Sequence, residues 1–393
     1  MKKIVLITLS LLGMQMAKAQ TDNRVITTGV PFLTIAADAR SAGMADNGVA
    51  TSADVFSQQW NPAKYAFALK EHGLSFSYTP YLTDIANDIS LGQVTYYNRI
   101  NERSAFAGSL RYFGLGDIEL RNEAEDDPVI RSPNELAVDL SYSLKLDEQF
   151  AMAVAGRFIS SNLRIPESAG GGDSKPATSF AFDVAAFYQS EEIAFNDFNG
   201  RFRAGLNLQN MGPKISYDND PDLSSNFLPA TMRLGGGFDF IFDEYNKLGV
   251  NLEFAKLMVP TPQELTDKNG DGVADQEDQI ILNQEYNDIS WVSGIFKSFG
   301  DAPDGFSEEL KEITYSVGAE YTYQDAFAFR LGYFNENEMK GARKFFSLGA
   351  GFRYTVVKID VSYLFSASQV RNPLENTLRF SLSFNFGDDY DEY

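Results

Sequence analysis

The amino-acid sequence predicts an all-β fold, a 14-stranded antiparallel transmembrane β-barrel with a small N-terminal helical plug. Three observations predict it. Apolar and polar residues alternate with the strand period of two in many short segments. Most short connections between these segments alternate with longer ones, as periplasmic turns and external loops do in outer-membrane barrels. The face opposite the apolar one is rich in Gly, Ser, Asn, Asp and Arg, which suits a polar lumen better than the dry core of a soluble sandwich.

The first segment, residues 1–19, has the pattern of a secretory signal peptide. Lys2 and Lys3 precede the apolar run Ile4–Met14, and Ala17–Ala19 fits a cleavage site before Gln20. The apolar run is too short for a spanning helix. The chain contains no Cys, so we expect neither a lipid anchor nor a disulfide framework. These features predict export to the bacterial outer membrane, with the lipid bilayer as surroundings.

The second segment, residues 20–72, is predicted to form the plug. Ile35–Met44 and Ser52–Phe67 favour short helices, the second of them interrupted at Pro62. A segment this small does not fold well alone, and burial inside the barrel would shield it. The only His of the chain, His72, is interpreted as a turn residue before the first strand. The residues expected to characterise the plug are Phe32, Leu33, Arg40, Trp60, Asn61 and Pro62.

The barrel itself is expected to span residues 73–386. Most alternating segments have the length needed to cross a bilayer at barrel tilt, and their even number suits a closed barrel. Gly235–Gly237 is expected where a strand bends or the plug approaches closely. Both termini are then expected on the periplasmic side, with residues 387–393 as a mobile acidic tail. The fourteen segments lie near 74–81, 87–97, 103–113, 134–144, 150–159, 178–189, 201–210, 231–241, 246–255, 313–323, 326–334, 345–354, 356–365 and 376–386.

Composition argues against two functional classes. The formal net charge is −21, so a nucleic-acid partner is not expected. With one His and no Cys the sequence offers no convincing catalytic triad, and it has no phosphate-binding glycine motif. An enzyme is therefore not predicted.

One motif with specific spacing lies in the long external loop 256–312. Its oxygen donors follow the one-three-five-seven-nine-twelve pattern of a calcium loop, with Gly272 at the sharp turn. The motif predicts a structural Ca²⁺ ion that stiffens the loop. No flanking helices are evident, and an acidic surface turn is the alternative. The candidate ligands are Asp267, Asn269, Asp271, Val273 through its carbonyl, Asp275 and Asp278.

The same loop carries two apolar clusters, one near its start and one near its end. Apolar groups in an external loop indicate either a surface for a partner protein or a lid folded over its own barrel. The residues concerned are Leu257, Met258, Val259, Trp291, Val292, Ile295 and Phe296.

The plug region resembles a known family. Val30–Met44, Gly48–Thr51 and Trp60–Tyr65 are similar to the corresponding segments of the PorV (LptO) family of type IX secretion, within the FadL-like barrels. The resemblance implies a non-enzymatic protein that binds the C-terminal signal domain of secreted cargo. It also implies association with a SprA/Sov-type translocon barrel and delivery of cargo to the attachment complex at the cell surface. The alternative is a FadL-like channel for hydrophobic small molecules, and an outer-membrane enzyme is a third, disfavoured possibility.

Overall fold

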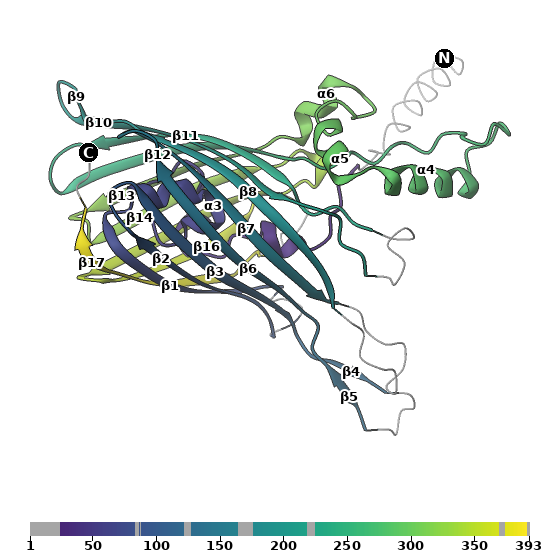
Figure 1. Ribbon diagram of the computed structural model, residues 1–393, viewed down its shortest axis with the longest axis horizontal. Coiled ribbons are helices and arrows are strands. Elements are labelled where there is room, and N and C mark those ends of the chain that lie inside the picture. Colours follow the sequence, from purple (N-terminus) through teal and green to yellow (C-terminus); the bar gives the residue numbers. More distant parts are fainter. Residues whose placement is uncertain are drawn as a thin grey trace, which may run out of the picture.

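A closed barrel of fourteen antiparallel strands forms the body of the molecule (Figure 1). The computed structural model describes residues 24–82, 86, 88–121, 127–163, 176–217, 225–368 and 374–390, so the expected signal peptide lies outside the described residues. The β1–β17 and β10–β11 pairings complete the ring. The barrel strands are β1 (Lys70–Pro80), β2 (Ile89–Arg99), β3 (Ser104–Leu115), β6 (Asn134–Lys145), β7 (Phe150–Asn162), β8 (Ala177–Gln189), β10 (Asn199–Met211), β11 (Thr231–Ile241), β12 (Asn246–Leu257), β13 (Thr314–Tyr323), β14 (Phe327–Asn335), β15 (Lys344–Tyr354), β16 (Val357–Ser366) and β17 (Leu378–Asp389).

The fold prediction is confirmed, and the strand ends differ from it by a few residues. β1 begins at Lys70, so His72 lies within this strand and not in a turn. β17 continues to Asp389, which is the register partner of Lys70 and forms a 2.6 Å ion pair with it. Gly387–Asp389 therefore belong to the sheet and not to a free tail. The Tyr390 ring covers the Arg99 guanidinium, which lies 3.9 Å from the ring centroid.

Each strand presents an apolar face outward and a polar face to the lumen. In β6, Leu140 is 70% exposed, whereas its neighbours Asp139 and Ser141 are buried. The outward side chains form the band that meets lipid, as expected for strands with alternating faces. In the part of the chain that the structure describes, none of the helices has the length and apolar character to cross a membrane.

The plug fills the lumen with four short helical elements. They are η1 (Pro31–Thr34), α2 (Ala39–Ala42), α3 (Ser57–Trp60) and η2 (Pro62–Phe67). The expected helix Ile35–Met44 is shorter than predicted, because the Asp38 carboxylate accepts the Ser41 N–H at 2.7 Å and caps a helix that begins only at Ala39. The Ala39 and Ala45 N–H groups donate to the hydroxyls of Ser381 and Ser347, both at 2.8 Å. The break at Pro62 is confirmed, since α3 ends at Trp60 and Asn61, the residue before Pro62, is extended.

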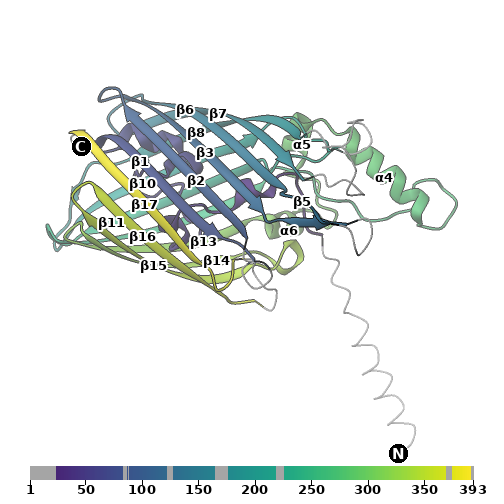
Figure 2. The same cartoon turned by 90° about the horizontal axis from the view of Figure 1, so that it is seen from below.

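The two ends of the barrel differ. Tight turns such as Gln324–Asp325 join strands at one end, which we call the short-turn end. The opposite, long-loop end carries α4 (Gln276–Asp288), α5 (Trp291–Lys297), α6 (Phe306–Glu309), η3 (Leu310–Glu312) and η4 (Glu338–Lys340), and α4 stands clear of the barrel in both views (Figures 1 and 2). A separate hairpin, β4 (Ile118–Leu120) and β5 (Val129–Arg131), extends from β3 and β6 at this end, whereas the two-residue strand β9 (Ile193–Ala194) pairs with β10 at the other.

The start of the described chain lies at the long-loop end. Arg24 pairs with the external carboxylates of Glu264 at 3.0 Å, Asp304 at 2.7 Å and Glu308 at 3.4 Å. The chain then descends through the lumen and enters β1 at the short-turn end. The expectation that both termini are periplasmic is therefore wrong for the N-terminal side, because these carboxylates hold Arg24 at the external surface.

Candidate functional site

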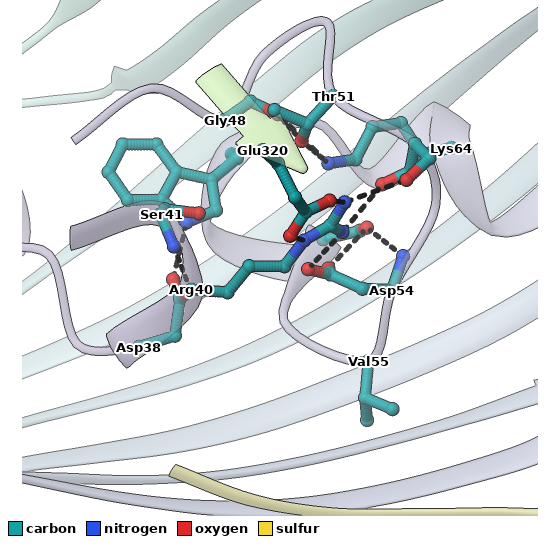
Figure 3. A network of polar contacts seen from close by, with 12 residues as sticks. Asp38, Arg40, Ser41, Gly48, Thr51, Asp54, Val55, Lys64 and Glu320 are labelled. Carbon is teal, nitrogen blue, oxygen red and sulfur yellow. Dashed lines mark hydrogen bonds and ion pairs between the residues drawn. The ribbon is translucent and has the colours of Figure 1, made fainter. Parts of the chain in front are cut away.

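The polar centre of the plug is Arg40, whose guanidinium bridges plug and barrel (Figure 3). Its Nε and Nη2 atoms donate to the two oxygens of Glu320 on β13, at 3.1 and 2.7 Å. Its Nη1 donates to Asp54 at 2.9 Å and to the carbonyl of Ser52 at 3.1 Å. A planar guanidinium suits this two-pronged contact with a carboxylate. Arg40 thus ties two plug segments to one strand.

The ionic contacts continue from Glu320 across the barrel wall. Arg330 on β14 donates to Glu320 at 2.6 Å and lies 2.8 Å from Asp360 on β16. Lys358 lies 3.6 Å from the same Asp360. We call Asp54, Arg40, Glu320, Arg330, Asp360 and Lys358 the ionic ladder. Opposite charges alternate along it, so each desolvated group has a partner of opposite sign.

The other residues predicted to characterise the plug are also buried inside the barrel. The Trp60 indole N–H donates to Asp38 at 2.7 Å, and the Trp60 carbonyl accepts from Asn207 of β10 at 2.8 Å. Asn61 reaches from the plug to the Ala186 carbonyl of β8 at 2.9 Å. Pro62, at the start of η2, is buried as well. These contacts join the end of α3 and the start of η2 to β8 and β10.

The long-loop end of the plug is fixed by Phe32 and Leu33. The Phe32 ring stacks on Phe113 of β3 with centroids 6.2 Å apart. The Leu33 carbonyl accepts from Arg111 of the same strand at 2.9 Å. Both residues are buried, as an apolar seal near the external loops requires.

Lumen glycines let the plug backbone approach the strands. A Cβ atom on Gly205 would lie 2.0 Å from the Val49 carbonyl oxygen, and one on Gly332 would lie 2.3 Å from the Ala45 nitrogen. Gly235 is similarly close to the Val49 side chain. The prediction that Gly235–Gly237 permits close approach of the plug is confirmed. Glu253 completes this side, since it accepts the Gly48 and Val49 N–H groups at 2.8 and 2.9 Å.

A cavity of about 400 Å³ lies between the plug and the short-turn end. Its wall carries charged groups of both signs, including Arg203 paired with Asp239 and every member of the ionic ladder except Arg330. Such a lining suits water and ions better than an apolar ligand, for which pockets are mostly apolar.

The base of the external loop, residues 258–313, rests on a second group of charges that the sequence does not predict. Lys340 lies 2.6 Å from Glu308 and 2.8 Å from Glu312. Lys256 pairs with Glu312 and, at 3.1 Å, with Glu309. Although burial acts to raise the pKa of Glu312, hydrogen bonds from Lys256, Lys340 and Thr261 hold it below the ordinary value. These contacts clamp the loop to the neighbouring connection 336–343.

Asp301, in the same loop base, has a raised pKa, whereas that of Glu312 is lowered. Burial, and then the negative charges of Glu309 and Glu312, raise its pKa to about 6. Its Oδ2 accepts the Thr261 N–H at 3.1 Å. This carboxyl is therefore the group of the external loop base that a mildly acidic medium would protonate.

The seven residues expected at a partner surface do not share one environment. Met258 and Val259 are buried at the barrel rim, and Trp291 and Ile295 of α5 pack with Met211 and Met258. Leu257 ends β12 and is half-buried. Val292 and Phe296 are exposed. The structure thus divides the set between residues packed against the strand ends and residues on an exposed surface, and neither alternative covers all seven.

The predicted calcium ligands lie on a turn that leads into α4. Asp267 accepts the N–H groups of Gly270 at 2.7 Å and Gly272 at 2.8 Å, and Asp271 accepts that of Val273 at 2.8 Å. Asp275 caps α4, and Asp278 is buried against the backbone of the turn. The expectation of no flanking helix is wrong, because this capping box starts a 13-residue helix whose weak apolar periodicity hides it in the sequence. Within the described residues, no three acidic or His side chains gather as a metal-binding group.

Known proteins resemble this chain in family and in fold. The family described as "Type IX secretion system protein PorV" matches residues 18–264. Among solved structures, the chain is similar to the toluene transporter TodX of Pseudomonas putida, with 11% identity, 92% of this chain and 98% of that chain covered, and a TM-score of 0.48. The toluene transporter TbuX of Ralstonia pickettii is 13% identical, with 88% of this chain and 97% of that chain covered and a TM-score of 0.46. A FadL homologue of Pseudomonas aeruginosa is 13% identical, with 93% of this chain and 100% of that chain covered and a TM-score of 0.42.

No curated protein matches the chain. The family match covers more than half of the chain, and it includes the plug and the strands from β1 to β12. The outer membrane is where a barrel of this kind resides. The chain therefore belongs to the PorV family of type IX secretion system proteins.

Proposed function

We propose that this protein is a non-enzymatic cargo receptor of type IX secretion. It would bind the C-terminal signal domain of cargo at a SprA/Sov-type translocon barrel and carry it to the attachment complex at the cell surface. The observation that best supports this role is the contrast between a lumen filled by the plug and an external end rich in exposed apolar side chains.

Because the plug fills the lumen, the structure favours binding of partners at the external surface over transport of a molecule through the barrel. The ionic ladder and the buried residues Trp60 and Asn61 occupy the middle of the barrel. A channel for hydrophobic molecules would need a continuous apolar path, but the cavity at the short-turn end is lined by charged groups. The FadL-like channel is therefore the less supported function.

The external end offers two kinds of surface to a folded partner. One is apolar: Ile280 on α4, Phe306 on α6 and Leu310 on η3 are exposed. The other is a strand edge. β4 and β5 form a two-stranded sheet of their own, and within the described residues their outer edges have no strand partner. A β-rich cargo domain could add a strand to such an edge, gaining backbone hydrogen bonds.

The test is a mild-detergent pull-down from outer membranes with a tag after Tyr393. The variant replaces residues 265–284 of the projecting arm by a short Gly-Ser linker. A short linker can join the two ends because the chain on either side of the arm is already close together: the Tyr286 hydroxyl donates to the Pro260 carbonyl at 3.2 Å. A matched control replaces the β9 connection, residues 191–198, at the short-turn end.

The expected result is loss of the translocon barrel and of cargo from the arm variant alone. Both variants should still migrate as folded, heat-modifiable barrels. Full recovery of partners with the arm variant would show that the arm is not their binding surface. Recovery of the unaltered protein with bound lipid but no secretion protein would favour the channel.

A further inference from the structure

Helix α5 lies on the outer wall of the barrel and not over its mouth. The Trp291 ring meets Phe182 of β8 edge-on, with centroids 6.0 Å apart. Trp291 and Ile295 also pack with Val184, Leu208 and Met232. These strand residues occupy outward positions, since their neighbours Asp183 and Asn207 are buried on the lumen side. The helix therefore rests on the same face of the strands that carries the lipid-facing band.

The orientation of α5 about its own axis follows from Gly294. A Cβ atom there would lie 2.7 Å from the Phe227 ring and 3.2 Å from Pro260. Both residues lie beyond the external strand ends, because β11 starts at Thr231 and β12 ends at Leu257. The Gly294 side of the helix thus faces the external loops.

Val292 and Phe296 point the other way. Each is two residues from Gly294, which places it about 160° around a helix axis. They are 46% and 75% exposed. The side of α5 opposite the loops is the side toward the bilayer, where Phe180 of β8 is 63% exposed in the lipid-facing band.

We propose that α5 is an interfacial membrane helix whose Val292 and Phe296 side chains insert into the lipid at the outer surface of the membrane. The apolar surface of the helix is continuous with the band of β8, and a short amphipathic helix buries its apolar side about 5–10 Å into such an interface. Trp291 supports this depth, because indole rings favour the membrane–water boundary. Lys297, exposed on the polar side, can meet anionic headgroups.

The consequence is a membrane anchor for the base of the external loop. The clamp formed by Lys256, Lys340 and their carboxylates fixes the loop to the barrel, and α5 fixes it to the lipid surface. Val292 and Phe296 would then belong to the membrane and not to a cargo or translocon contact. This assignment rests on the barrel fold and is independent of the proposed secretion role.

The test uses depth-dependent fluorescence quenching with the purified full chain in lipid nanodiscs. The chain contains no Cys, so Phe296→Cys and Val292→Cys each give a single site for an environment-sensitive fluorophore. The quencher is a lipid spin-labelled near the top of its acyl chain. Phe180→Cys serves as the lipid-facing reference, and Ile280→Cys, 57% exposed on the projecting α4, serves as the aqueous reference.

The expected result is a blue shift and a loss of emission at position 296 comparable to those at Phe180→Cys. The second position reports the same environment if one variant fails to fold. Emission at both positions that stays as red and as unquenched as at Ile280→Cys would overturn the proposal and return these residues to a protein interface. Because no translocon or cargo is present, this outcome is separate from failure of the secretion role.

Discussion

Arg40 and Glu320 lie 280 residues apart in the sequence and meet through two hydrogen bonds of 3.1 and 2.7 Å inside the barrel. Each neutralises the charge of the other at a site shielded from water. Asp54 forms a further ion pair with Arg40, and Arg330 forms one with Glu320. The plug is therefore held by charge pairing as much as by apolar packing. A network of this kind is sensitive to removal of one member, because the remaining charge is left buried without a partner.

Glu320→Gln should loosen the plug. Breaking a buried pair from one side costs about 3–5 kcal/mol, and here two guanidinium groups lose their shared carboxylate. We expect a lower thermal midpoint and a larger single-channel conductance in planar bilayers. The matched control is Lys268→Ala, which removes a more exposed 2.7 Å pair with Glu285 and should cost about 0–1 kcal/mol. Conductance equal to that of the unaltered protein would mean that other contacts hold the plug.

Gly205→Ala should destabilise the folded barrel. The added methyl would collide with the Val49 carbonyl, and backbone cannot move aside as a side chain can, so we expect a cost of about 1–3 kcal/mol. Gly156→Ala is the control, since a Cβ atom at this outward position of β7 meets nothing within 4 Å. Urea unfolding in lipid vesicles measures both. Equal stability of the two variants would contradict the close approach of plug and β10.

The barrel was predictable because its signal is local. Alternation along Leu136–Lys145, for example, depends only on which face meets lipid and which meets the lumen. The break at Pro62 was predictable for the same reason, because proline lacks the donor a helix needs. The close approach at Gly235 was predictable as well, because a glycine in a strand marks a close backbone approach.

The polar partners were not predictable, because they join distant segments. Nothing near Arg40 in the sequence points to Glu320, and Lys256 meets Glu309 and Glu312 only after the loop folds back. A signal did exist: charged residues such as Glu320, Arg330 and Asp360 stand at lumen-facing positions of strands, where each needs a partner. The position of Arg24 at the external end likewise depends on carboxylates from a loop far along the chain.

Calcium should protect the turn 267–278 from protease if the predicted ligand set closes on the ion. Without an ion, Asp267 and Asp271 accept backbone N–H groups of the turn, and rotation of these carboxylates would free oxygens for Ca²⁺. We expect Asp271→Ala to abolish the difference between digestion with calcium and with chelator. Glu277→Ala, at an exposed position outside the ligand pattern, should retain it. Identical digestion of the unaltered protein under both conditions would refute the site.

Mild acid should tighten the base of the external loop through Asp301. Its pKa is raised from 3.8 to about 6 by burial and by Glu309 and Glu312, so between these values the folded loop binds a proton that the unfolded chain does not. Stability therefore increases as pH falls through about 6, and this gain is complete near the unfolded value. Glu308 and Glu312 have lowered pKa values, so their pairs with Lys340 weaken only below the ordinary value of 4.5.

Hydrogen exchange of residues 298–312, corrected for intrinsic rates, should slow from pH about 7 to about 5 in the unaltered protein. Asp301→Asn should remove this dependence, because the amide keeps the shape but does not titrate. If the exchange rate of Asp301→Asn still depended on pH in this range, the effect would belong to another group of the clamp.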